Sequence, residues 1–148
     1  MGDWEGTGRG LPGEGVEEMD CGFVLQGKFL RIRNRSVYEP QEKNPEGEVH
    51  EDWDFISYDQ NRETFVLREF HVEGFVNQYV LDTVSEDGSR LTFLTESLEN
   101  VPKEWRGRET FRFLGDDEFQ NTFELARPGE EFKVYVETHL HRRHDGVE

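Results

Sequence analysis

Apolar and polar residues alternate with a period of two along most of the chain, and turn-forming residues interrupt the alternation about every ten positions. Period two places successive side chains on opposite faces of a strand, and short turns join neighbouring strands into antiparallel hairpins. No window has the 3.6-residue period of an amphipathic helix, so little or no helix is expected. The pattern predicts ten strands, at approximately 3 to 9, 15 to 25, 28 to 38, 48 to 58, 63 to 72, 75 to 84, 90 to 98, 104 to 114, 118 to 126 and 131 to 142.

Strands joined in sequence by short turns form an up-and-down meander. Such a sheet leaves two edge strands with unpaired N–H and C=O groups unless it closes on itself. Closure removes both edges, which favours a barrel over an open sheet. We therefore predict an all-β fold, an antiparallel up-and-down β-barrel of about ten strands, with residues 1–148 as a single domain.

The alternation also predicts which side chains face the barrel interior. In the strand 48 to 58, Trp53 and Phe55 indicate that their face, which includes Glu51, is the inner one. In the strand 28 to 38, the face without arginine is predicted to be inner: Leu30, Ile32, Asn34, Ser36 and Tyr38. Aromatic inner faces with a few polar groups are typical of a ligand pocket. The predicted ligand-binding residues are Trp53, Phe55, Glu51, His71, Asn77, Tyr79, Phe93, Trp105, Glu109, Phe111 and Phe123.

These residues favour a non-enzymatic protein that binds a small apolar or amphipathic ligand, with the polar members fixing its orientation. An enzyme is one alternative, because Glu69 and His71 share a face and Glu51 could meet Glu109 across the barrel as an acid/base pair. A purely structural protein or a homodimeric interaction protein is a further alternative. One sequence does not show which side chains converge.

The composition of the chain limits the classes of partner that it is expected to bind. The chain carries 17 Lys and Arg against 33 Asp and Glu, a formal net charge of −16, which repels phosphate backbones and anionic bilayers. Nucleic acid and membranes are therefore not expected as partners. The single Cys21 excludes an intramolecular disulfide, and no secretory leader or long apolar run is present, so we expect a cytoplasmic protein. A saline habitat is one explanation of the acidity that the sequence leaves open.

Two motifs suggest other chemistry. The segment Gly8 to Gly13 matches the dinucleotide pattern G-x-G-x-x-G, but no helix follows it to bind a pyrophosphate. His139 and His141 share one face of the last strand, opposite Leu140, and alternation directs them outward. We predict that neither motif forms a nucleotide or metal site.

Four short motifs occur in the order seen in a bacterial lipocalin-like family of unknown function. They are Trp4-Glu5-Gly6-Thr7-Gly8, Leu25-Gln26-Gly27-Lys28-Phe29-Leu30, the segment Trp53 to Asp59 that ends in Ser57-Tyr58-Asp59, and Glu131 to Arg143. The chain resembles that family over most of its length. The resemblance implies a calycin-type barrel around a small-molecule pocket.

The chain is more distantly similar to nitrobindin and related fatty-acid-binding-protein-like haem barrels, which close on a strand whose histidine ligates haem iron. His139 is the matching position here. The Tyr-Pro that follows the nitrobindin glycines is missing, since Arg9-Gly10-Leu11-Pro12 stands there, and the alternation aims His139 outward. We therefore expect no cofactor, with haem ligated by His139 as the alternative.

Overall fold

A computed structural model of the protein describes residues 1–144, which form ten β-strands and no helix. The strands are β1 (Gly2–Gly10), β2 (Gly13–Val24), β3 (Phe29–Tyr38), β4 (Glu48–Asp59), β5 (Thr64–His71), β6 (Val76–Val84), β7 (Arg90–Glu99), β8 (Arg106–Gly115), β9 (Glu118–Ala126) and β10 (Lys133–Arg142). The predicted all-β class and strand count are confirmed, and each boundary lies within two residues of its predicted place. No helix in this part of the chain is long and apolar enough to cross a membrane.

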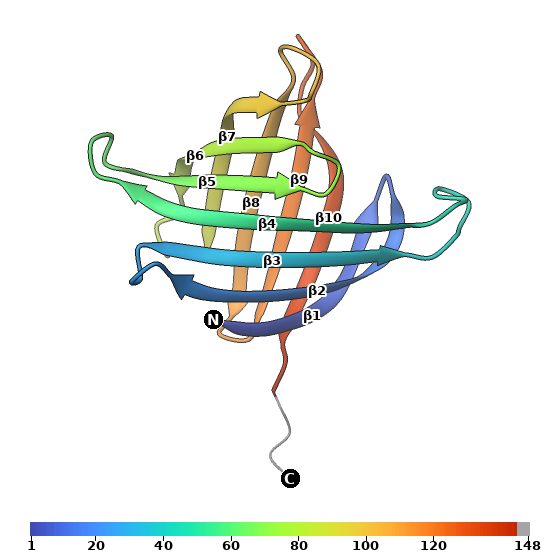
Figure 1. The fold of residues 1–148 in the computed structure, drawn as a ribbon, viewed down its shortest axis with the longest axis horizontal. Coiled ribbons are helices and arrows are strands. Elements are labelled where there is room, and N and C mark those ends of the chain that lie inside the picture. The colour runs from blue at the N-terminus through green and yellow to red at the C-terminus, as the bar shows by residue number, and fades with distance from the viewer. Residues whose placement is uncertain (145–148) are drawn as a thin grey trace.

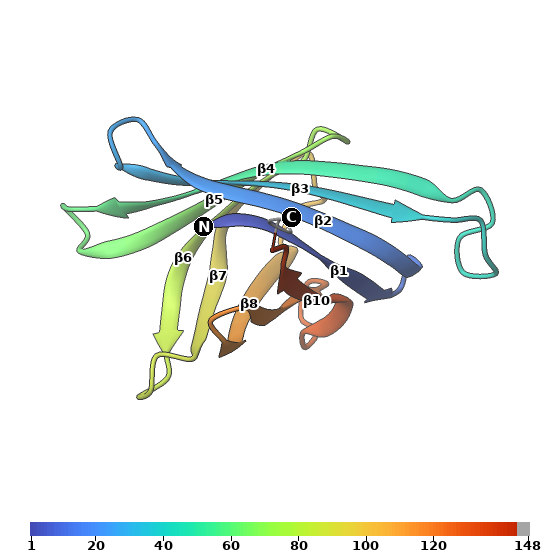
Figure 2. The same ribbon diagram turned by 90° about the horizontal axis from the view of Figure 1, so that it is seen from below.

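Every strand pairs antiparallel with its neighbours in the chain, and β1 pairs with β10 to close the barrel. Figure 1 shows β2 to β5 running across β8 to β10, and Figure 2 shows these groups as two opposed walls. The closing seam brings two backbones very close together. A Cβ atom on Gly6 would collide with the His139 carbonyl, so this position needs glycine.

Two apolar clusters fill part of the interior. In the first, Trp4 packs edge-on against Phe119 with ring centroids 5.0 Å apart, and Leu140 completes the buried set. The second consists of the buried side chains of Leu67, Tyr79 and Phe93. Phe111 packs against both clusters.

The inner face of β3 is the predicted one, and Ile32, Ser36 and Tyr38 on that face are buried. The prediction for β4 is wrong. Trp53 is 53% exposed and Glu51 is exposed on the outer surface with Phe55, while Asp52 and Asp54 are buried. The pairing with β3 explains this reversal. Asn34 lies opposite Asp52 and Ile32 opposite Asp54, and directly paired residues share a face.

The aromatic residues on the outside of β4 pack against one another and against arginine. Trp53 lies opposite Phe70, and the Arg33 guanidinium lies 5.8 Å from the centre of the Trp53 ring. The rings of Phe55 and Phe70 are 6.2 Å apart. They line an open outer groove of about 510 Å³. Stacking on a cation and partial cover by neighbours account for aromatic side chains in water.

Candidate functional site

Five carboxyl groups are buried in the barrel, and besides Glu17 they form what we call the carboxyl cluster: Asp52 and Asp54 on β4, Glu69 on β5 and Glu109 on β8. Each is at most 8% exposed. Asp54 is directly opposite Glu69 in the pairing of β4 with β5. Among residues 1–144, no lysine or arginine forms an ion pair with any of the four. The basic side chains within ion-pair distance of the cluster are histidines, His50 beside Asp52 and His71 beside Glu69.

Side-chain amides supply most of the hydrogen bonds to the cluster. Asn34 donates to Asp52 at 2.6 Å and to Asp54 at 3.0 Å. Asn121 donates to Glu109 at 2.6 Å, and Asn77 lies 3.5 Å from Glu69. Asp54 Oδ1 is buried without a hydrogen-bond partner. A buried acceptor with no donor carries the full cost of its lost hydration.

The cluster shifts the acidity of its own members. Burial, followed by the charge of Asp52, raises the pKa of Glu69 to about 7. The same two causes hold the pKa of Asp54 well above its ordinary value. Burial and the charge of Glu69 do the same to the pKa of Glu109. Carboxyl groups this close cannot all ionise without a cation, so protons take that place in the free protein.

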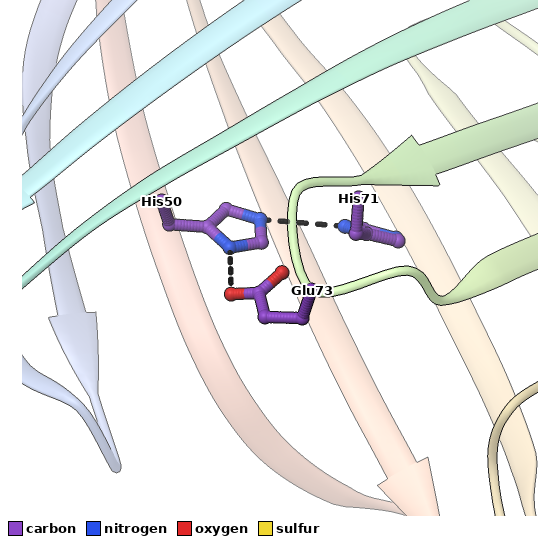
Figure 3. A group of neighbouring side chains, drawn as sticks. All are labelled: His50, His71 and Glu73. Carbon is purple, nitrogen blue, oxygen red and sulfur yellow. Dashed lines mark hydrogen bonds and ion pairs between the residues drawn. The ribbon is translucent and has the colours of Figure 1, made fainter.

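Two histidines lie at one end of the cluster, where β4 begins and β5 ends. His50, His71, Glu73 and Asp52 form what we call the histidine rim, and Figure 3 shows the first three. His50 Nδ1 lies 2.7 Å from Glu73 Oε1 and His50 Nε2 lies 3.3 Å from His71 Nδ1. His50 Nε2 is also 3.2 Å from Asp52 Oδ1. The His50 and His71 side chains are 26% and 15% exposed, so the rim is open to solvent.

Burial affects the two histidines differently. It lowers the pKa of His50, but hydrogen bonds with Asp52 and Glu73 outweigh it and raise that pKa to about 9. His71 has no comparable carboxylate contact, and burial lowers its pKa. One imidazole of the rim therefore carries the positive charge that faces Asp52.

The structure brings one of the two predicted acid/base pairs together. Glu69 Oε1 lies 3.9 Å from His71 Nε2, and the Asn77 amide contacts both side chains. The other pair does not converge, because Glu51 points out of the barrel and lies 3.6 Å from Arg35 while Glu109 is buried inside.

Most of the other predicted site residues face the interior. Asn77, Tyr79 and Phe93 are buried, and Tyr79 accepts a hydrogen bond from Asn77 at 3.2 Å. Phe111 and Phe123 are paired with Asn121 and Glu109, which face inward. Trp105 precedes β8 and stacks with Arg127, whose guanidinium lies 5.6 Å from the ring centre. Binding of a ligand by these residues stays a prediction.

His139 does not fit the position of a haem ligand inside the barrel. Its Nε2 lies 2.5 Å from Glu118, and its ring is 4.7 Å from that of His141 on the same face. The neighbouring Leu140 occupies the interior, where it packs with Trp4. The alternation of β10 therefore places both histidines outside, as predicted.

Sequence reasoning missed Asp52, Asp54, His50 and Glu73. A signal for the first three was present in the neighbouring strand. His71 and Glu69 had been assigned to an inner face of β5, and they pair with Asp52 and Asp54. Because paired residues share a face, the inner face of β5 predicts that Asp52 and Asp54 form the inner face of β4. Glu73 lies in the turn after β5, where alternation predicts nothing.

No protein-family model matches the chain, and no curated protein is similar to it. Fourteen chains of solved structures are similar, among them that in the crystal structure of Rv2717c from M. tuberculosis. The two chains share 19% sequence identity and superpose with a TM-score of 0.72 over 97% of this chain and 92% of the other. At this identity the likeness shows the barrel fold alone, so the lipocalin-like family stays a prediction.

Proposed function

We propose that the protein binds, inside the barrel, a small amphipathic ligand whose polar end is a cation such as a primary ammonium group. The observation that carries this proposal is Asp54 Oδ1, an acceptor buried without a partner among three other carboxyl groups. An entirely apolar ligand would leave that acceptor unpaired. The inner face of β4, which carries Asp52 and Asp54 in place of Trp53 and Phe55, supports the cationic end.

A cation meets two needs of this interior. It donates hydrogen bonds to Asp54, and it offsets the repulsion among carboxylates that would otherwise have to be protonated. The apolar end has neighbours as well, since the cluster of Leu67, Tyr79 and Phe93 lies on strands β5 to β7 beside Glu69. The partly exposed histidine rim adjoins the carboxyl cluster, since Asp52 belongs to both.

Three ligands of equal chain length test the proposal: butylamine, butanol and butyrate. We expect butylamine to raise the melting temperature of the protein in a saturable manner, since a ligand that binds only the folded state stabilises it by mass action. Butanol and butyrate should not do so. Stabilisation by butanol or butyrate equal to that by butylamine would contradict the proposal, because apolar contact alone would then explain binding.

A matched pair of variants locates the effect. Asp54→Asn removes the buried charge, and Glu51→Gln removes an outer charge on the same strand. We expect the butylamine shift to fall to less than half in Asp54→Asn and to be unchanged in Glu51→Gln. Equal shifts in both variants would place the amine outside the carboxyl cluster.

A further inference from the structure

The donor atoms of the histidine rim have the chemistry and spacing of a metal site. Two imidazoles and a carboxylate are the ligands that Zn²⁺ and other first-row divalent ions take in proteins. Tetrahedral ligands at the usual Zn–N and Zn–O lengths lie about 3.3 Å from one another. His50 Nε2 lies 3.3 Å from His71 Nδ1 and 3.2 Å from Asp52 Oδ1. Both measured separations match the edge of such a tetrahedron.

The residues around these donors hold them in place. Glu73 Oε1 accepts the Nδ1 proton of His50 at 2.7 Å, so Nε2, which faces the rim, is the nitrogen that becomes a ligand when a metal ion displaces its proton. Asn34 donates to Asp52 Oδ2 at 2.6 Å and leaves Oδ1 for another partner. Hydrogen-bonded carboxylates behind a ligating histidine fix its tautomer and its orientation. The donor residues of the rim are therefore themselves held by hydrogen bonds from neighbouring side chains.

We propose that His50, His71 and Asp52 bind a divalent transition-metal ion, with Glu73 as the residue that orients His50. Three protein ligands leave a fourth position for water or for a small anion or neutral donor, as in open metal sites. His71 binds through Nδ1, and its Nε2 lies 3.3 Å from the Asn77 side-chain amide. This site shares Asp52 with the carboxyl cluster, but it does not use Asp54, on which the proposed amine site depends.

The outer face of the barrel offers a comparison site. Glu118, His139 and His141 also bring two imidazoles and a carboxylate together. His139 and Glu118 are each 38% exposed there, whereas His71 and Asp52 of the rim are 15% and 11% exposed. A fixed, partly buried set of ligands loses less freedom on binding an ion than exposed side chains do. The rim is therefore expected to bind the ion more tightly than the outer site.

Cobalt(II) chloride, added to the full chain at pH 8, tests the site. We expect one equivalent to give the visible absorption of cobalt with nitrogen ligands and low coordination number, and Zn²⁺ to displace it. His50→Ala and His71→Ala should each weaken cobalt binding at least tenfold. Glu73→Gln, at an exposed position in the turn after β5, should weaken it roughly tenfold to a hundredfold, as loss of an orienting carboxylate does.

The control is the double variant His139→Ala/His141→Ala, which should retain the absorption and the affinity. Unchanged affinity in His71→Ala and Glu73→Gln would overturn the proposal, and so would loss of binding in the outer double variant alone. If circular dichroism shows that His50→Ala is unfolded, the affinity of Glu73→Gln decides the outcome. Cobalt binding should survive Asp54→Asn, so failure of the amine proposal and failure of the metal proposal can be told apart.

Discussion

Asp54 on β4 lies directly opposite Glu69 on β5, so two buried carboxyl groups face the barrel interior from adjacent strands. Asp52 and Glu109 bring the set to four. Burial of ionised carboxylates without a cation is unfavourable, and burial of several together is more so. His50 supplies a positive charge to Asp52, and the other three carboxyl groups favour bound protons or a bound cation.

Removal of one buried carboxylate should stabilise the protein. We expect Asp54→Asn to raise the free energy of unfolding at pH 8 by roughly 1–3 kcal/mol, because it keeps the contact with Asn34 and removes a charge from the cluster. Urea denaturation measures this value. Glu51→Gln, on the outer face, should change it by less than about 0.5 kcal/mol. Destabilisation of Asp54→Asn by more than Glu51→Gln would mean that the charge is already compensated.

The inner and outer faces of the barrel predict different losses of stability for two tryptophans. Trp4 is 7% exposed and packs against Phe119, so Trp4→Ala should cost about 3–5 kcal/mol of unfolding free energy. Trp53 is 53% exposed, and Trp53→Ala should cost less than about 1 kcal/mol. Chemical denaturation compares the two. A larger loss for Trp53→Ala than for Trp4→Ala would show that the Trp53 side chain lies in the interior.

Glu17 should make stability depend on pH. It is buried beside Ser36 and Tyr38, and burial raises its pKa from 4.5 to about 6 despite their hydrogen bonds. A pKa raised by folding means that the protonated group stabilises the native state. That contribution is full below pH 4.5 and is lost as the pH rises through 6. The free energy of unfolding of the wild type should therefore fall across this window by about 1–2 kcal/mol more than that of Glu17→Gln.

Urea denaturation at several pH values from 4.5 to 6 checks the effect. Glu18→Gln is the matched control, because Glu18 is the next residue on β2 and is exposed. Its pH dependence should follow that of the wild type. Parallel curves for all three proteins would show that Glu17 has an ordinary pKa in the folded state.

Gly8 on β1 should not tolerate a side chain. A Cβ atom at this position would collide with the Glu17 carboxylate, which Ser36 and Tyr38 hold in place. We expect Gly8→Ala to lower the free energy of unfolding by about 1–3 kcal/mol. Gly115 has open space around its Cβ position, so Gly115→Ala should have little effect. Equal effects in the two variants would show that the contact between β1 and Glu17 is loose.

The sequence predicts the fold well because turn residues and period-two alternation are local signals. They place all ten strands, and the short connections determine their order. Local signals do not determine which face of a strand points into the barrel. In β4, aromatic content predicts Trp53 as an inner residue, whereas the pairing with β3 and β5 places Asp52 and Asp54 there. Register with neighbouring strands decides the face, and aromatic side chains outside are covered by each other and by arginine.

The candidate site depends even more on contacts between strands. His71 and Glu69 are recognisable from alternation alone, since both lie on one face of β5. Their approach to His50, Glu73 and Asp52 requires the pairing of β4 with β5 and the turn that follows β5. Nothing local in the sequence predicts those separations.

Binding of an amine at the carboxyl cluster is tested most directly by ¹³C NMR of the Asp and Glu carboxyl carbons during addition of butylamine. We predict that the resonances of Asp54 and Glu69 move with one saturable binding curve, while that of Glu51 on the outer face does not move. Variants Asp54→Asn and Glu69→Gln assign the signals. Unmoved resonances of Asp54 and Glu69 at saturating butylamine would contradict the account of the barrel as a binding site for a cationic ligand.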